Sequence, residues 1–490
     1  MRKRARRAHR VASALAAAIV WVGAPSGADW RDNLTFTLSD RARGEVVDWF
    51  GPPDGTAHSG AERYAFFANQ LRAGVRVDWP HVQLAVEAQD TRLVGIPDDA
   101  TLPPPQGPLG PGAVYFLNTR DTSQGETFLK QGFATLRWRG FTAKLGRFEY
   151  RDGAETTPGD ATVAFLKRAR INERLVGTFD FTHVTRSFDG GLLAYDQPGW
   201  NATAIGLRPT RGGFEVSANR ELDGVTLAGL SLTAKRLPFS AAPPADLRLF
   251  YLYFEDRRNE PLKVDNRALA ARRADRDAIF IHTIGGHAVT AIDAGPGVLD
   301  GLVWAAGQAG DWGELDHLAW AYAAELGYQL PRVPAQPWFR VGYDASSGDG
   351  DPADGDHETF FQVLPTARVY AQFPFFNLMN NRDLFAQWIL RPHARVTIRT
   401  DYHWLSLAER GDLWYSGGGA TNAKIFGYAG SPSGGHRALA HLVDVSATVS
   451  LHDRVSLGLY YGHAFGRSVV RTSFADADAD YGFAELTLRY

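Results

Sequence analysis

The sequence predicts an all-β protein: a transmembrane up-and-down antiparallel β-barrel of about 18 strands. The first observation is a series of segments of about 8–12 residues in which apolar and polar residues alternate. The second is that short connections alternate with long ones along the chain. Outer-membrane barrels have this pattern, with tight turns on the periplasmic side and long loops on the extracellular side. The third is composition, because 12% of the residues are aromatic although the mean hydropathy is slightly negative. A large soluble β protein would have the same composition, so the alternating segments and their connections decide between a soluble protein and an outer-membrane barrel.

Alternation is clearest in four segments. Residues 70–79 and 82–89 alternate on either side of Pro80, and residues 443–451 and 455–461 form a second such pair. Residues 95–125, 346–357 and 416–435 are instead long connections rich in Gly, Pro and Asp. This regular exchange of tight turns and long loops favours a barrel over a sandwich. Residues 268–277 are the exception, because they predict a short helix within a loop.

The sequence ends on an alternating segment, YGFAELTLRY. Ala484, Leu486, Leu488 and Tyr490 share its apolar face, which we expect to contact outer-membrane lipid. An open apolar edge invites aggregation, so we expect this strand to pair with the first one and close the sheet. A terminal aromatic on the last strand also resembles the signal that the outer-membrane assembly machinery reads.

The first 28 residues have the features of a signal peptide: a basic start, a short apolar run and a small-residue cleavage site. We therefore expect a signal peptide over residues 1–28 and a single outer-membrane barrel domain over residues 29–490 of a Gram-negative bacterium. The chain has 52 Lys and Arg against 54 Asp and Glu; six of the basic residues and no acidic ones lie in the signal, which leaves a net charge of −8. That balance argues against nucleic-acid binding. The absence of cysteine excludes disulfides and thiolate chemistry.

Many charged residues fall on the strand faces that should point inward. Arginine facing lipid at the bilayer midplane costs about 2–4 kcal/mol, so these residues should face a wet lumen. The predicted lumen residues are Arg41, Arg43, Arg72, Arg76, Arg137, Arg139, Asp180, Arg340, Asp344, Arg399 and Asp401. Arg137 and Arg139 flank Trp138, which predicts that both lie on one strand face. Such a set predicts either a path for anionic solutes or a ladder of salt bridges that stiffens the wall.

We expect no cofactor, no resident metal and no enzymatic activity. The acidic loop with Asp349, Asp351 and Asp354 raises the alternative of a calcium site, but its spacing does not match an EF-hand. The chain has no G-x-S-x-G, H-E-x-x-H or Walker motif. An outer-membrane enzyme such as a barrel lipase is kept as an alternative from another class.

Several phrases resemble the alginate-export family of outer-membrane barrels: AKLGRFEYRDGAE, FLKRARINERLVGTFDFTHVTRSFDGG, and PWFRVGYDASSGDGD followed by TFFQVLPT. The resemblance runs over residues 41–490. It implies an 18-stranded barrel that passes a polyuronate through an arginine-rich constriction, together with periplasmic export partners. Carried over by matching phrase, the pore candidates are Arg147, Glu149, Arg174, Arg340 and Asp344.

Strict alternation from Phe141 through Leu145 puts Arg147 on the lipid side. Either Gly146 marks a bulge that turns the side chain inward, or Arg147 lies above the membrane. The sequence thus predicts an outer-membrane channel for export or diffusion of an alginate-like anionic polysaccharide. A porin for general solutes or small organic anions is the alternative within the same class, and a barrel with a plugged lumen is a further one.

Overall fold

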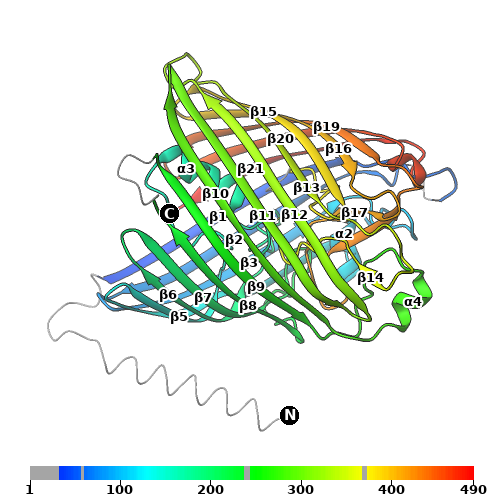
Figure 1. The fold of residues 1–490 in the computed structure, drawn as a ribbon, viewed down its shortest axis with the longest axis horizontal. Coiled ribbons are helices and arrows are strands. Elements are labelled where there is room, and N and C mark those ends of the chain that lie inside the picture. Colours follow the sequence, from blue (N-terminus) through cyan, green and yellow to red (C-terminus); the bar gives the residue numbers. More distant parts are fainter. Residues whose placement is uncertain (1–32, 57–59, 237–242, 367–371) are drawn as a thin grey trace, which may run out of the picture.

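In the computed structural model, the chain is a closed antiparallel barrel of 18 strands (Figure 1). The structure describes residues 33–56, 60–236, 243–366 and 372–490, so the expected signal peptide at 1–28 lies outside the described residues. The barrel strands are β1 (Leu34–Asp48), β2 (Arg63–Asp78), β3 (Val82–Val94), β4 (Ser123–Trp138), β5 (Phe141–Phe148), β6 (Phe188–Asp196), β7 (Trp200–Pro209), β8 (Val225–Ala234), β9 (Ala245–Asp256), β10 (Ile279–Ala294), β11 (Gly297–Trp312), β12 (Leu315–Gln329), β13 (Trp338–Ser346), β15 (Asn381–His393), β16 (Val396–Leu407), β19 (Ala438–His452), β20 (Val455–Gly466) and β21 (Asp478–Arg489). The predicted fold class and strand number are confirmed.

The barrel closes where the last strand meets the first. β21 pairs antiparallel with β1, in a register that runs from Ser39 opposite Arg489 to Asp48 opposite Asp480. One residue further, the Tyr490 N–H donates to the Leu38 carbonyl at 2.8 Å. The expected pairing of the first and last strands is therefore confirmed, and each barrel strand named above pairs with a neighbour on both sides.

Short and long connections separate the two ends of the barrel, called here the turn end and the loop end. At the turn end, tight turns join β2 to β3, β4 to β5, β10 to β11, β15 to β16 and β19 to β20. The loop end carries most of the remaining elements: α2 (Pro111–Thr119), α4 (Leu269–Ala274), β14 (Asp356–His357), β17 (Leu413–Gly417), β18 (Tyr428–Pro432) and η4 (Val470–Thr472). Helix α4 falls inside residues 268–277, where the sequence predicts a helix.

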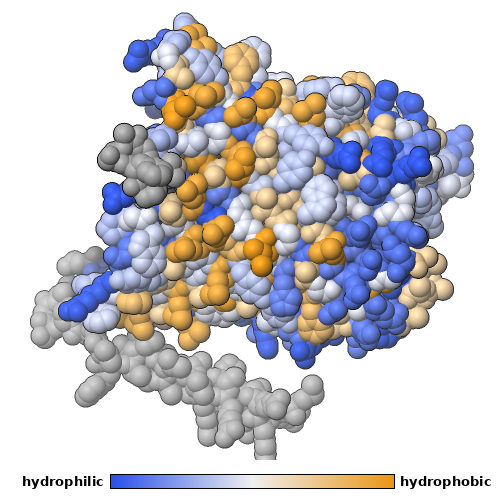
Figure 2. All heavy atoms as spheres, viewed as in Figure 1, coloured by the Kyte–Doolittle hydropathy of each residue, from blue (hydrophilic) through white to orange (hydrophobic). Residues whose placement is uncertain are grey.

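The outer face of the wall is apolar. Figure 2 shows hydrophobic side chains gathered over the strands and hydrophilic ones around the loop end. Exposed aromatic rings gather toward both ends of the strands. Those nearer the loop end are Trp320, Trp404 and Tyr461, and those nearer the turn end are Trp138, Phe141, Trp200, Phe339 and Tyr490. Amphipathic rings favour the two membrane interfaces, so the strands have the surface of a transmembrane barrel. No helix among the described residues has the length and apolar character needed to cross a bilayer.

The interior is not a simple wet lumen. The segment between β5 and β6, residues 149–187 and called here the inner loop, lies inside the barrel and carries α3 (Ala161–Leu166) and η2 (Lys167–Ile171). Phe165 of α3 packs on Trp338, the turn-end residue of β13, with ring centroids 5.0 Å apart. Val176 forms a parallel bridge to Leu364 of the β13–β15 loop, so two loops join each other inside the wall. The expectation of a water-filled interior needs correction, because a hydrophobic core of loop residues occupies part of it.

The outward face of mid-strand positions can be tested by charge insertion. Val303 lies mid-strand on β11 and faces outward, and Leu299 faces the same way near the turn end. We expect Val303→Arg to lower the free energy of unfolding in lipid vesicles by about 2–4 kcal/mol and Leu299→Arg by about 0–1 kcal/mol, because lipid solvates the charge worse at greater depth. Urea titration of the refolded proteins measures both. Equal effects at the two positions would contradict a bilayer around this wall.

Candidate functional site

The charged side chains inside the barrel fall into groups, and two of these groups connect the inner loop to the wall. Strand alternation points Arg41 and Arg43 of β1 and Arg72 of β2 inward, opposite in direction to the exposed Phe36 and Leu71. The structure thus places these three arginines on the inward faces of their strands. Each of them meets a partner that lies far away along the chain.

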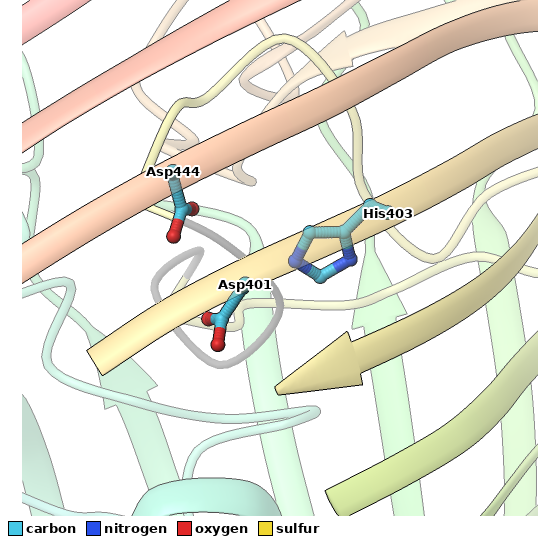
Figure 3. Close-up of side chains that lie close together, drawn as sticks. All are labelled: Asp401, His403 and Asp444. Carbon is cyan, nitrogen blue, oxygen red and sulfur yellow. The ribbon is translucent and has the colours of Figure 1, made fainter. Parts of the chain in front are cut away.

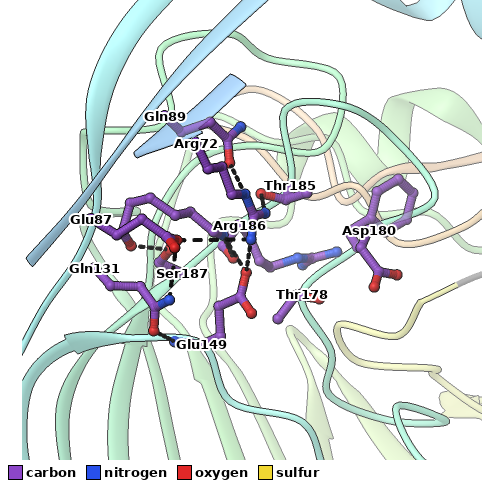
Figure 4. Close-up of polar contacts among 12 residues, drawn as sticks. Arg72, Glu87, Gln89, Gln131, Glu149, Thr178, Asp180, Thr185, Arg186 and Ser187 are labelled. Atoms are coloured by element: carbon purple, nitrogen blue, oxygen red, sulfur yellow. Dashed lines mark hydrogen bonds and ion pairs between the residues drawn. The ribbon is translucent and has the colours of Figure 1, made fainter. Parts of the chain in front are cut away.

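The first group is centred on Glu149, which begins the inner loop directly after β5 (Figure 4). Its Oε1 lies 3.0 Å from Arg72 Nη1 and 3.2 Å from Lys130 Nζ, and its Oε2 lies 3.4 Å from Arg151 Nη2. Burial alone would raise the pKa of Glu149, but the three cations outweigh it and lower the pKa to about 2. Glu149 is therefore ionised at any physiological pH and binds the inner loop to β2 and β4.

The two arginines of β1 bind the far end of the inner loop. Arg41 Nη1 donates to the Asp180 carbonyl at 3.0 Å, and Arg43 Nη1 donates to the Phe181 carbonyl at 2.9 Å. Arg43 also donates through Nε to Glu485 Oε2 of β21 at 2.8 Å. Asp180 in turn lies 3.5 Å from Arg151. The predicted residues Arg41, Arg43, Glu149 and Asp180 thus share one region of the lumen.

A second group lies at the opposite wall and is fully buried. Arg340 of β13 donates through Nη2 to Glu325 Oε2 of β12 at 2.7 Å and also contacts Asp300 of β11. Arg170 Nε of η2 donates to Glu325 Oε1 at 2.9 Å. Arg174 Nη2 lies 3.8 Å from Asp344 Oδ1. The structure therefore brings Arg174, Arg340 and Asp344 together, in a place where solvent does not reach their side chains.

A third group, on β16 and β19, consists of Arg399, Asp401, His403 and Asp444. Figure 3 shows the last three of these side chains. Arg399 forms an ion pair with Asp401, and 23% of the Arg399 side chain remains exposed. Asp444 lies directly opposite Asp401 on the neighbouring strand, and His403 lies two residues further along β16 on the same face. In the described part of the chain, this is the one place where three His or acidic side chains, Asp401, His403 and Asp444, come close enough to hold a metal ion.

Three predicted residues occupy the turn end of the barrel. Arg76 pairs with Asp78 at 2.6 Å, and Arg137 lies 3.8 Å from Asp78. Both arginines are exposed at the inner rim. Arg139, in contrast, lies in the β4–β5 turn with a φ of 48°, and its guanidinium lies over the Trp138 ring. The prediction that Arg139 shares a strand face with Arg137 is wrong, because β4 ends at Trp138.

Arg147 is not a lumen residue. The pairing of β4 with β5 runs through Gly146 without a register shift, so the bulge interpretation fails. Arg147 keeps the outward parity of Leu145 at the loop end of β5 and binds Asp189 of β6 through two hydrogen bonds, at 2.7 and 2.6 Å. Asn219, in the β7–β8 loop, accepts a further bond from Arg147 Nη1 at 2.8 Å. Of the two alternatives left open by the sequence, the structure supports a position at the end of the strand.

The acidic residues of the β13–β15 loop do not converge. Asp349 is buried, whereas Asp351 and Asp354 are exposed. Each uses a carboxylate oxygen to accept from a backbone N–H two residues further on, which is ordinary turn geometry. They are not among the described side chains that could share a metal ion, so the calcium alternative gains no support.

Several residues in these groups were not predicted. Lys130 was missed because a register shift between β3 and β4, beside Glu87, changes the parity of β4. Glu325 and Asp300 were missed, although Glu325 is the single acid on the buried face of β12. Arg170 lies on the inner loop, where no strand alternation could reveal its direction.

The fold is that of outer-membrane porins. One similar solved structure is the outer membrane protein opdK from Pseudomonas aeruginosa, with a TM-score of 0.54 and 10% identity over 93% of this chain and 99% of that chain. A second is OccAB2 from Acinetobacter baumannii, with a TM-score of 0.57 and 10% identity over 94% of this chain and 98% of that chain. A third is a BenF-like porin from Pseudomonas fluorescens Pf-5, with a TM-score of 0.58 and 7% identity over 94% of this chain and 100% of that chain. At these identities the likeness shows the fold alone. A search of curated proteins gives no match.

The family model for alginate export matches residues 32–473, which is most of the chain. The chain therefore belongs to the alginate export family, and the resemblance noted in the sequence is confirmed. Family and fold together make it an outer-membrane channel of a Gram-negative bacterium.

The buried group around Arg340 should matter for stability. Arg340→Ala leaves Asp300 and Glu325 without one of their buried cations, so we expect a loss of about 3–5 kcal/mol in the free energy of unfolding. Arg437→Ala, which breaks an exposed pair with Glu409, should change that free energy little. Urea unfolding in vesicles compares the two variants. A loss no larger for Arg340→Ala than for Arg437→Ala would contradict a structural role.

Two loop carboxyls predict a pH dependence of loop order. Burial raises the pKa of Asp349 to about 7, with a further contribution from Asp412, and burial raises the pKa of Asp412 to about 6. The Asp349 N–H donates to Asp412 Oδ2 at 3.0 Å and so joins the β13–β15 and β16–β19 loops. The neutral form of such an acid is favoured in the folded protein. Its contribution to the free energy of unfolding is therefore fully present below the unfolded pKa of 3.8 and is lost as the pH rises through the folded pKa.

We therefore expect hydrogen exchange at residues 346–366, corrected for intrinsic rates, to accelerate as the pH rises from about 4 to about 7 and to level off above that pH. Asp349→Asn keeps an uncharged side chain of similar shape and should flatten the profile. The same acceleration in wild type and in Asp349→Asn would show that another group is responsible.

Proposed function

We propose that this channel carries an alginate-like anionic polysaccharide across the outer membrane, past arginines that line the space between the inner loop and the β1–β4 wall. The observation that carries the proposal is the partial exposure of this group, in contrast with the buried group around Arg340. Arg41, Arg72 and Arg151 each keep part of their side chain accessible. A solute can reach a guanidinium only where water does.

The accessible arginines alternate with carboxylates. Glu149 and Asp180 face them from the inner loop, and Glu87 and Glu485 face them from the wall. A uronate carboxylate has the same shape as these side chains, so it can replace one of them on a guanidinium as it passes. The resident acids then reclaim the arginine and release the solute. This exchange keeps binding weak enough for transit.

Two further accessible arginines extend the group toward the turn end. Arg76 and Arg137 lie on the inner rim beside Asp78, where a solute would enter from the periplasmic side. Arg399, on β16, adds a further arginine whose side chain is partly exposed. The net charge of −8 on residues 29–490 does not argue against an anion path, because the local field decides permeation.

A second candidate function is a porin for small organic anions. The inner loop favours it, because this segment crosses the lumen from Arg41 on β1 to Glu325 on β12 and narrows the space that a polymer needs. The same arginines would then select small carboxylates.

Charge selectivity tests the arginine path. We expect Arg72→Gln combined with Arg151→Gln to lower the anion-over-cation permeability ratio severalfold, because Glu149 would lose two of its cations and repel anions. Arg92→Gln, on the exposed outer face of β3, is the matched control and should leave the ratio unchanged. Reversal potentials in planar bilayers under a salt gradient measure the effect. An unchanged ratio in the double variant would overturn the path.

Block of the ion current by uronate oligomers of different length distinguishes a channel for a polymer from a porin for small solutes. If the channel carries a polyuronate, oligomers should block the ion current at lower concentration as they lengthen, because they contact more arginines at once. Equal block by monomers and long oligomers would favour the porin.

A further inference from the structure

We propose that Asp401, His403 and Asp444 form a binding site for a divalent transition-metal ion, of which Zn²⁺ is the representative, in the lumen face of β16 and β19. Each residue offers one ligand atom, and these atoms all lie within 4.8 Å of one another (Figure 3). One imidazole and two carboxylates form a donor set that suits such ions. The site is independent of the arginine group between the inner loop and β1–β4.

The backbone places the three side chains together. Asp401 and Asp444 are direct cross-strand partners in the β16–β19 ladder. His403 follows Asp401 by two residues and so shares its face. All three side chains are buried, with at most 3% of each residue exposed. Two ligands come from one strand and one from its neighbour, so an ion here would join the strands.

Unused polar atoms point to a missing ligand. Asp401 Oδ1 and His403 Nε2 are both buried and have no hydrogen-bond partner. A buried polar atom without a partner costs about 1–3 kcal/mol, so each of these two atoms would be stabilised by a ligand. Coordination of a cation satisfies both atoms at once.

The surroundings hold the ligands as a metal site requires. Asp383 of β15 accepts from His403 Nδ1 at 2.8 Å, which leaves Nε2 as the ligating nitrogen. Tyr460 donates its hydroxyl to Asp444 Oδ2 at 3.0 Å. The carboxylate–histidine–metal arrangement is the usual way in which a protein orients a ligating imidazole.

The charge balance also favours a cation. Three carboxylates, Asp383, Asp401 and Asp444, share this part of the lumen with the guanidinium of Arg399. Arg170 of the neighbouring buried group also acts electrostatically on Asp401. Negative charge buried without compensation is costly, and a divalent ion removes the excess. The ligands of a tetrahedral zinc ion lie about 3.3–3.4 Å apart, since each bond is about 2.0–2.1 Å. Side-chain rotations that shorten the longest ligand-to-ligand separation by roughly 1–1.5 Å would therefore close the group around an ion.

Cobalt binding tests the site directly. The untagged barrel, stripped with a chelator and kept in detergent, is titrated with Co²⁺ and then with Zn²⁺. We expect one equivalent to bind with a visible ligand-field spectrum, which Zn²⁺ displaces. His403→Gln and Asp444→Asn should each lose this equivalent. His287→Gln, which alters another buried lumen histidine paired to an aspartate, should retain it.

Asp383→Asn probes the orientation of the imidazole and should weaken Zn²⁺ binding by about 10–100-fold without abolishing it. Each variant is compared only when its electrophoretic mobility shifts on heating, as expected of a folded barrel, and the wild-type spectrum itself decides the matter if the variants fail to fold. A wild-type protein that gives no such spectrum, or a His403→Gln variant with the wild-type stoichiometry and affinity, would overturn the proposal.

Discussion

The hydrocarbon of the bilayer offers no partner to a backbone N–H or C=O, and the rest of this structure depends on that constraint. Every barrel strand must find a neighbour on both sides, so the first strand has to meet the last. The β1–β21 ladder and the bond between Tyr490 and Leu38 meet that requirement. Once the sheet is closed, alternation sends one face of every strand to lipid and the other to the interior.

Closure creates a second problem, because a barrel of 18 strands encloses more space than its own inward side chains fill. The chain fills part of it with the inner loop and with segments of the β13–β15 and β16–β19 loops. Phe179, Phe361 and Trp414 belong to the resulting core, in which loop residues pack with inward-facing residues of the strands. Apolar burial thus stabilises the loops in the interior, while the outer surface of the same barrel remains apolar for lipid.

Charge inside such a barrel serves two purposes that the amino-acid type does not distinguish. Arg340 is enclosed by Asp300 and Glu325, and there the arginine neutralises acids that could not be buried alone. Arg72 and Arg151 meet Glu149 with part of their surface in contact with water. The surrounding loop decides which arginines hold the structure together and which remain available to a passing anion.

The metal site that we propose follows from the same geometry. Strand pairing sets Asp401 beside Asp444, although 43 positions separate them, and Asp383 reaches His403 from the third strand. Such a group has no spacing that a motif search would detect. It becomes visible only when the register of β15, β16 and β19 is known.

The sequence by itself determined the barrel, its approximate strand number, its family and the inward direction of residues such as Arg41, Arg72, Arg340 and Asp401. Each of these rests on local alternation or on contiguous phrases, which a single chain displays without any knowledge of its partners. Alternation failed at Arg139, where the strand had already ended, and missed Lys130, where a register shift changes parity. Only the tertiary structure decided that the inner loop crosses the lumen, that Arg340 is sealed while Arg72 is not, and that Asp401 meets Asp444. Those outcomes depend on contacts between segments far apart in the chain, and the free energy that selects them is not encoded in any one stretch of residues.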